Sequence, residues 1–329
     1  MAVDPSPCPA VRVVVVHYGD QVLTQRCLAS LAGVRWPSRQ LEVVVVDNGP
    51  GELDRKLVND TFPAAVVVAP GRNSGFAGGV NLGVAQQPTG HAYVALLNND
   101  AVADPDWLAP LVAALEADDG LGAACSKIVL EEPPGLINSA GLLLVEHGFG
   151  ADRGYLEPDE GQYDTPEEVF GWCGGAALLR ASYLAETGPL DERFFAYYED
   201  FDLSWRGRLL GWRYRYVPTS VVHHRHAAGL GVGSEEFRFL VGRNRLLALA
   251  KLAPLRMAVR AALVEVKLAF VGGPGSLRRH GRVLASTLRW LPGMLRERRR
   301  LARRRVVGTE AVLVWATPAE RRLGEDGGH

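Results

Sequence analysis

Short runs of β-branched apolar residues alternate with segments of helical spacing over the first 120 residues. Such runs are typical of strands buried on both faces, whereas apolar residues three and four positions apart are typical of helices packed on a sheet. The pattern predicts strands over 11–16, 41–46, 64–69 and 93–97, and helices over 20–32, 76–86 and 107–117. This order predicts an α/β fold with an open, doubly wound, mostly parallel sheet.

The pattern is less regular in the second part of the chain. Residues 131–170 are rich in Pro, Gly, Glu and Asp and predict a mobile excursion. Further on, the spacing predicts strands over 171–179 and 214–224 and helices over 198–210 and 238–252. We expect one domain over residues 1–250, followed by a helical C-terminal extension over residues 251–329.

Charge divides the chain in the same way. Fifteen Lys or Arg and only two acids lie between Lys251 and Arg305, whereas the remainder holds 21 basic and 35 acidic residues. The formal net charge of −1 hides this asymmetry. An acidic body with a basic segment indicates an anionic partner, either a membrane or a nucleic acid.

The four cysteines lie far apart and form no CxxC pair. This spacing argues against a disulfide framework or a zinc cluster and indicates reduced thiols in a cytoplasmic protein. The first residues include an acid and lack both a basic region and a long apolar region. We therefore expect no signal peptide.

Polar residues follow each of the four predicted strands. They are Tyr18, Asp47, Arg72 with Asn73, and Asp100. Ligands of open α/β sheets bind beyond the carboxyl ends of the strands, so these side chains are candidates for one binding site. Each taken alone also fits a helix cap or a turn.

A glycine-rich loop spans Gly71–Gly83. Glycines let the backbone approach a ligand closely, and a helix N-terminus favours a phosphate. The alternative is that these glycines serve only helix-to-strand packing. A dinucleotide fingerprint is excluded because it would follow the first strand, whereas this loop follows the third.

These motifs together resemble those of family 2 glycosyltransferases, in particular the bacterial rhamnosyltransferase-like members. The resemblance covers residues 11 to about 250 and rests on motifs in the family's order: Val45–Gly49 (VVDNG), Asn73–Gly83 (NSGFAGGVNLG), Leu96–Asp100 (LLNND), Gly171–Arg180, Leu190–Leu203 and Arg243–Arg245. It implies a Rossmann-like GT-A fold and an inverting transfer from a nucleotide sugar.

The resemblance also implies the donor site and a divalent cation, Mg²⁺ or Mn²⁺. Its donor-binding residues would be Tyr18, Asp47, Arg72, Asn73, Gly75, Phe76, Gly78, Gly79, Asn81, Asn99 and Asp100. Asp100 ends the family's D-x-D motif, in which Asn98 here replaces the first acid. His224 would be the second metal ligand, although the neighbouring His223 and His226 leave this choice open; surface or structural histidines are the alternative.

Three acids lie close together in Tyr198–Leu203, among several aromatic residues. Crowded, partly enclosed acids raise one another's pKa, which suits a general base. The resemblance makes Asp200 the catalytic base and Glu199 a supporting group. Trp172, Gly174 and Asp202 are expected on the acceptor side, with Asp202 alternatively an acid that starts the helix or supports the site from behind. If residues 131–170 are not simply mobile, we expect them to shape the acceptor site. The alternative is that the acids only stabilise a helix N-terminus.

The sequence thus predicts metal-assisted, inverting transfer of a sugar to a hydroxyl of a cell-wall or surface polysaccharide or a lipid-linked glycan. The favoured donor is dTDP-L-rhamnose, with UDP-galactose, UDP-glucose and GDP-mannose left open. The alternative is a catalytically silent glycan-binding or scaffold protein of the same fold. A nucleotidyltransferase is disfavoured because no basic glycine-rich loop follows the first strand.

The apolar segment over residues 252–271 contains Arg256, Arg260, Glu265 and Lys267, which excludes a membrane-spanning helix. A basic amphipathic helix on an anionic membrane fits better, reinforced by Arg289, Trp290 and the arginines of 296–305. The protein would then be peripheral at the inner face of the plasma membrane. A solvated basic surface or a homodimer contact is the alternative. We expect no nucleic-acid partner because no binding module accompanies the charge.

Overall fold

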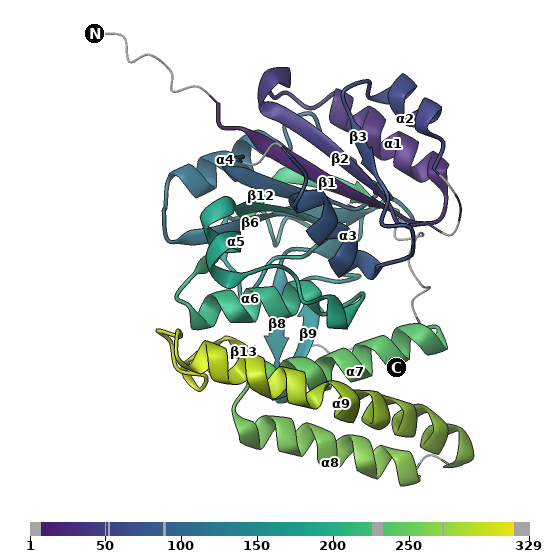
Figure 1. Cartoon of the computed structure of the whole chain (residues 1–329). Helices are drawn as coiled ribbons and strands as arrows, with labels where there is room; N and C mark the ends of the chain where they lie inside the picture. Colours follow the sequence, from purple (N-terminus) through teal and green to yellow (C-terminus); the bar gives the residue numbers. More distant parts are fainter. Residues whose placement is uncertain are drawn as a thin grey trace.

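The computed structural model describes residues 8–49, 51, 53–87, 90–225, 233–271 and 273–318. Its centre is a curled sheet with the strand order β10-β12-β6-β11-β4-β1-β2-β3, to which β5 and β7 add at β12 and β6 (Figure 1). The strands are β1 Val11–His17, β2 Leu41–Asp47, β3 Val66–Val68, β4 Tyr93–Leu97, β5 Ala101–Ala103, β6 Leu121–Leu130, β7 Ile137–Ser139, β10 Glu167–Glu168, β11 Ala176–Arg180 and β12 Arg213–His224.

The N-terminal half of the sheet is parallel, as the apolar runs predicted. Strand β1 pairs in parallel with β2 and β4, and β2 pairs in parallel with β3. Strand β11 then inserts antiparallel between β4 and β6, and β6 pairs in parallel with β12. In the register, His17 lies beside Asp47, so the polar residues after β1 and β2 reach the same edge of the sheet.

Helices cover both faces of this sheet. One apolar core joins the sheet to α1 (Gln21–Ala32), α2 (Arg55–Thr61) and α4 (Leu108–Glu116). The opposite core joins it to α3 (Gly75–Val84), α5 (Ala181–Thr187) and α6 (Glu199–Leu209). The structure is therefore the α/β fold that the sequence predicted.

Residues 131–170 are more ordered than the sequence indicated. They contribute β7 and β10 to the main sheet and form a hairpin of β8 (Leu142–Val145) and β9 (Phe149–Asp152), to which β13 (Ala316–Thr317) adds. Ile137, Ser139 and Leu144 of this stretch are fully buried. The stretch is ordered rather than mobile because tertiary contacts, not its own pattern, hold these strands in place; that it faces an acceptor stays a prediction.

The C-terminal part is helical. Helices α7 (Glu235–Leu252), α8 (Leu255–Val271) and α9 (Gly273–Ala302) form a layer at the bottom of Figure 1, beyond α6 and the β8–β9 hairpin. A third apolar core joins this layer to α6 through residues such as Trp205, Leu247 and Met294. Among the described residues, no helix is long and apolar enough to cross a membrane.

Candidate active site

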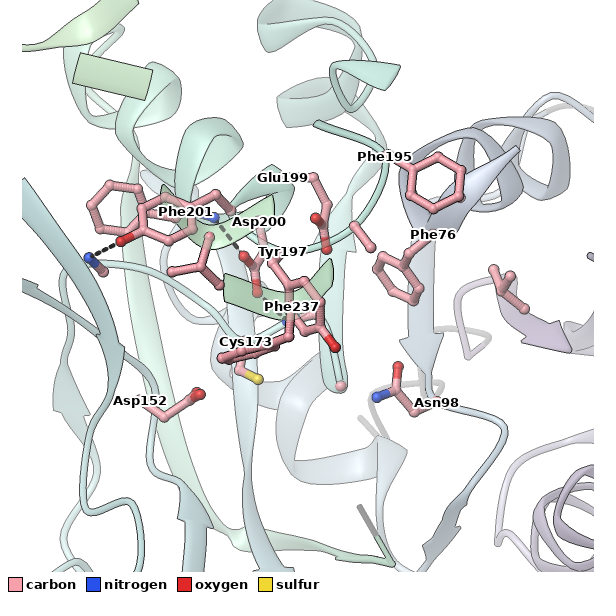
Figure 2. A pocket seen from close by; sticks show the side chains of 18 of the residues that line it. Phe76, Asn98, Asp152, Cys173, Phe195, Tyr197, Glu199, Asp200, Phe201 and Phe237 are labelled. Carbon is pink, nitrogen blue, oxygen red and sulfur yellow. Dashed lines mark hydrogen bonds between the residues drawn. The ribbon is translucent and has the colours of Figure 1, made fainter. Parts of the chain in front are cut away.

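A cleft of about 510 Å³ opens at the carboxyl ends of β1, β2 and β4. Its lining combines strand-end polar residues, the loop before α6, the start of α6, and residues from β9 and β12. Of the predicted site residues, the structure brings together Tyr18, Asn73, Gly75, Phe76, Asn99, Asp100, Gly174, Glu199, Asp200 and His224. Aromatic side chains form much of the wall in Figure 2, including Phe76, Phe195, Tyr197 and Phe237.

Asp100 and His224 meet at one side of the cleft. The Nε2 atom of His224 lies 2.9 Å from Oδ1 of Asp100 and 3.3 Å from the amide nitrogen of Asn98. Both side chains are nearly buried. On the other side of the ring, Nδ1 lies 2.6 Å from Oδ1 of Asn138 in β7. An N–H at Nδ1 that donates to Asn138 leaves the lone pair of the neutral ring at Nε2, beside the carboxylate.

This arrangement fits a divalent cation. A carboxylate oxygen and an imidazole nitrogen are suitable ligands for Mn²⁺, and the hydrogen bond from the far ring nitrogen to Asn138 is the kind that orients metal-bound histidines. Within the described part of the chain, no group of three or more His, Cys, Asp or Glu could hold a metal. A cation bound by Asp100 and His224 would thus complete its coordination with substrate phosphate oxygens and water.

Of the neighbouring histidines His223, His224 and His226, the structure describes the first two, and the alternation of β12 separates their side chains. Its residues point to opposite faces of the sheet in turn, so His223 faces away from His224. His223 instead lies 3.2 Å from Asp104. His226, the third histidine of the cluster, lies outside the described residues.

Asn48 organises the glycine-rich loop. Its amide nitrogen donates to Oδ1 of Asn73 and to the carbonyl of Gly75, and its amide oxygen accepts from the backbone and hydroxyl of Ser74. Gly75 has a positive φ of 72°, and a Cβ there would lie 2.3 Å from the carbonyl oxygen of Phe195. Glycine is therefore required at the point where this loop meets the segment before α6.

Asp200 lies at the start of α6 and faces the cleft. Its carboxylate accepts from the backbone nitrogens of Gly174, at 2.9 Å, and Phe201, at 2.7 Å. Burial raises the pKa of Asp200 to about 6, and the charge of Asp152 adds to this effect against the two backbone hydrogen bonds. A carboxylate with this pKa is ionised at neutral pH and can still take up a proton, as a general base must.

Glu199 lies beside Asp200, and its pKa is raised as well. Burial, followed by the charge of Asp200, raises the pKa of Glu199 well above its ordinary value. Both acids of this pair thus have raised pKa values. Figure 2 shows the carboxyl groups of Glu199 and Asp200 together at the cleft, with Asp152 and Asn98 on other parts of its wall.

The segment before α6 has a strained backbone that α7 holds in place. Phe195, Tyr197 and Tyr198 all have positive φ values, which bulky residues rarely adopt. The buried amide of Asn244 in α7 donates to the carbonyls of Phe194, Ala196 and Tyr197. Such strain persists only where the surroundings determine the conformation, and here Asn244 holds three carbonyls of the segment by hydrogen bonds.

Arg243 and Arg245 extend this support from the same helix. Arg243 donates to the carbonyls of Arg193 and Phe194. Arg245 donates to the carbonyl of His147 between β8 and β9, and its guanidinium lies 3.5 Å from the centre of the Phe149 ring. The Arg243–Arg245 motif thus positions both the loop before α6 and the β8–β9 hairpin.

Two predicted acceptor-side residues do not face the cleft. Trp172 is fully buried, and its indole nitrogen lies 3.3 Å from the hydroxyl of Tyr183. Asp202 is also fully buried, and it forms ion pairs with Arg206 and Lys251 at 2.8 and 2.9 Å. Both side chains are enclosed in the protein interior, Trp172 before β11 and Asp202 on α6, so neither lines the cleft, and their assignment to the acceptor side stays a prediction.

Three predicted donor-binding residues of α3 also point away from the cleft. A Cβ on Gly79 would lie 2.7 Å from Val16, and one on Gly78 would lie 2.8 Å from Ser74, so these glycines permit close packing. The amide of Asn81 exchanges two hydrogen bonds with the backbone of Leu190. Gly78, Gly79 and Asn81 thus fix α3 and the loop before α6, and their direct contacts with the donor stay predictions.

Asp47 and Arg72 lie near the cleft but outside its lining. The carboxylate of Asp47 accepts from the backbone nitrogens of Leu53, at 3.0 Å, and Gly49, at 3.4 Å. Arg72 is exposed on the loop after β3. Their contacts with the donor stay predictions.

Sequence reasoning missed Asn48, Asn138, Asp152 and Cys173, all of which line the cleft. Asn48 stands directly after the predicted strand-end acid Asp47, so its position was the available signal. Asn138 and Asp152 lie in the stretch for which no regular structure was predicted. Only the tertiary fold brings these two beside His224 and Asp200.

The comparisons with known proteins agree with this geometry. The model of the family "Glycosyl transferase family 2" matches residues 12–187. Two similar curated proteins, from two strains of Mycobacterium tuberculosis, are named N-acetylglucosaminyl-diphospho-decaprenol L-rhamnosyltransferase. Each is 28% identical over 240 residues, which cover 66% of this chain and 77% of the relative. A glucomannan 4-beta-mannosyltransferase of Arabidopsis thaliana is 25% identical, covering 73% of this chain and 43% of that protein.

Solved structures show the same fold. The mannosyltransferase PcManGT from Pyrobaculum calidifontis, in complex with GDP-Man and Mn²⁺, superposes with a TM-score of 0.54 at 19% identity, covering 92% of this chain and 88% of that one. GalNAc-T7 with UDP, GalNAc and Mn²⁺ gives 0.61 at 16% identity, covering 87% and 56%. With a family model that spans more than half of its residues, this chain belongs to glycosyl transferase family 2.

Proposed function

We propose that this enzyme transfers L-rhamnose from dTDP-L-rhamnose to a hydroxyl of a cell-wall or surface polysaccharide or lipid-linked glycan, with inversion and with the help of Mg²⁺ or Mn²⁺. The reaction would take place on the cytoplasmic side of the plasma membrane. One observation carries the proposal: a single cleft holds the Asp100–His224 pair at the strand ends and the raised-pKa acid Asp200.

The donor would lie along the strand ends, where Tyr18, Asn73 and Asn99 line the cleft. Asp100 and His224 would hold the cation, which supplies positive charge to the departing nucleoside diphosphate. Asp200 would accept the proton of the attacking acceptor hydroxyl through the carboxylate that Gly174 and Phe201 orient. Attack from the face opposite the diphosphate inverts the anomeric carbon.

The aromatic wall has a role in the same reaction. Phe76, Phe195, Tyr197 and Phe237 enclose the acids, and the rings of Tyr197 and Phe237 pack edge to face at 4.9 Å. Enclosure excludes water, which otherwise competes with the acceptor hydroxyl for the activated sugar. The choice of rhamnose rests on the names of the mycobacterial relatives.

A donor screen tests the proposal. The purified chain is incubated with dTDP-L-rhamnose, UDP-galactose, UDP-glucose or GDP-mannose, with Mn²⁺, Mg²⁺ or EDTA, and with a polyprenyl diphosphate glycan as acceptor. Nucleoside diphosphate release that requires the cation and is greatest with dTDP-L-rhamnose supports the proposal. Release from another donor would replace the sugar, and the absence of both release and cation-dependent nucleotide binding would favour a silent glycan-binding protein.

A further inference from the structure

Helix α8 presents an apolar face that nothing in the described chain covers. Its exposed large apolar side chains are Leu255, Val259, Leu263, Val264, Val266, Leu268, Phe270 and Val271. Phe270 is 76% exposed and Leu263 is 64% exposed, which is far from the burial usual for such residues. We call these eight side chains the α8 face. Contiguous apolar surface of this kind marks a site of interaction with a protein or a membrane.

The exposed charged side chains of α8 itself are all positive. Arg256, Arg260 and Lys267 are exposed on the same helix, and Arg256 pairs with Glu310. Glu265, the acid of α8, is buried on the inner side and lies 2.5 Å from His280 of α9. Helix α8 therefore exposes apolar and cationic side chains but no acid.

The arginines of α9 contribute less to such a surface than their number indicates. Arg298 donates to the carbonyls of Ala250 and Ala253, where α7 ends. Arg300 pairs with Glu297 at 3.0 Å, and Arg304 donates to the carbonyl of Glu186. Three of the seven arginines in residues 296–305 thus make contacts within the protein, and none of these ten residues is an exposed large apolar one, so α8 is the stretch that exposes both kinds of side chain.

Helix α8 lies next to the β8–β9 hairpin, which contributes to the cleft. Helix α8 contacts the turn Glu146–Gly148 that joins β8 to β9. The following residues Gly150 and Asp152 of β9 line the cleft. A surface bound by α8 would therefore lie near the hairpin that forms part of the cleft wall.

We propose that the α8 face docks on an anionic lipid bilayer, with α8 lying in the headgroup region. Exposed apolar side chains interspersed with cations suit that region, where burial of apolar area and attraction to anionic lipids act together. A second copy of the chain fits less well, because a two-fold contact places like patches together and would oppose cations without an acid from α8. The role of docking rests on the proposed function, since it brings a lipid-linked acceptor to the cleft.

Flotation of the full chain with liposomes tests the docking. The vesicles are phosphatidylcholine alone or phosphatidylcholine with phosphatidylglycerol, and the variant is Leu263→Glu/Phe270→Glu. We expect the wild type to float with the anionic vesicles. The variant should float at least about tenfold less, because two apolar side chains that would be buried in the bilayer are replaced by anions. Arg260→Gln/Lys267→Gln is expected to float less with the anionic vesicles than the wild type.

Val22→Glu is the matched control, because Val22 is 53% exposed on α1, at the other end of the molecule from α8 (Figure 1). It should float like the wild type. Equal flotation of the wild type and the α8 variant, or no flotation of the wild type, would overturn the proposal. A wild-type dimer in size-exclusion chromatography that becomes monomeric in the α8 variant, with flotation unchanged, would assign the face to self-association instead. Flotation does not depend on turnover, so a negative donor screen would not change the result of the flotation experiment.

Discussion

At the scale of single residues, the chemistry depends on carboxyl groups whose surroundings differ. Asp200 receives two backbone hydrogen bonds yet has a pKa raised to about 6, because burial outweighs them. Glu199, beside it, has a pKa raised well above its ordinary value. Asp100, in contrast, is paired with His224. One acid is thus suited to accept a proton and another to bind a cation.

The raised pKa predicts the pH dependence of turnover. A base works only when ionised, so kcat should fall as the pH drops through about 6 and should be constant just above it. Asp152 contributes to the raised value through its negative charge. Asp152→Asn should therefore shift the acidic limb of the kcat profile to lower pH, whereas Asp119→Asn, at a fully exposed acid, should leave it in place. An acidic limb that does not move would contradict this coupling.

Asn138 is predicted to tune the binding of the cation through His224. Without the acceptor at Nδ1, the ring loses its fixed orientation and tautomer. Asn138→Ala should raise the Mn²⁺ concentration needed for half-maximal turnover by about 10- to 100-fold. The control Asn59→Ala, at an exposed site on α2, should not change it. A cation requirement equal in both variants would remove Asn138 from this role.

At the scale of elements, helix α7 determines the shape of the cleft without lining its polar part. Asn244 and Arg243 hold the backbone from Arg193 to Tyr197, and Arg245 holds the turn between β8 and β9. Asp200 and Asp152 follow directly after these two segments. The Arg243–Arg245 motif is therefore a positioning device for acids on two different elements.

The substitution Asn244→Ala should weaken the support that α7 gives to the backbone before α6. Loss of its amide removes the donor to the partly buried carbonyls of Ala196 and Tyr197, which should lower the free energy of unfolding by about 1–3 kcal/mol. Displacement of Asp200 should reduce kcat by about 10- to 100-fold. Arg238→Ala, exposed on the same helix, is the control. Thermal denaturation and kcat measured together check this, and wild-type values of both would contradict it.

The elements differed in how readily they could be predicted. Strands β1, β2 and β4 followed from apolar runs, and α3 and α6 from spacing and flanking residues. Strand β6 was not predicted because polar residues interrupt it: Ser126 is buried by bonds to Trp107 and Ser220, and Lys127 by pairs with Asp159 and Asp164. These partners are distant in sequence, so the local pattern does not identify the strand. The same holds for the residues of the site. Asp100 and Asp200 could be predicted from sequence motifs, whereas Asn138 and Asp152 could not.

At the scale of the whole molecule, the C-terminal helices and the catalytic part share a core. We propose residues 1–250 as the catalytic domain and 251–329 as its extension. Buried side chains of both, such as Phe201, Trp205, Ala261 and Met294, nevertheless belong to one apolar cluster. The extension should therefore stabilise the wall of the cleft from which Asp200 projects.

Met294→Ala tests that joint stability. Met294 is fully buried in α9, so its truncation should cost about 2–5 kcal/mol of the free energy of unfolding. Calorimetry should show one transition shifted to lower temperature, with cation-dependent nucleotide binding lost in the same transition. Leu288→Ala, on an exposed face of α9, should change the stability by less than about 0.5 kcal/mol. Two separate transitions would show that the extension unfolds on its own.

The most direct test of the central claim compares the wild type with Asp200→Asn in the presence of dTDP-L-rhamnose, Mn²⁺ and a lipid-linked glycan acceptor. Asparagine keeps the size of the side chain and one of its two acceptor oxygens but cannot take the proton. We predict a fall in kcat of about 100- to 10,000-fold, with donor affinity and melting temperature unchanged. A kcat near that of the wild type, in a variant that is folded and binds the donor, would contradict the assignment of Asp200 as the base of this transferase.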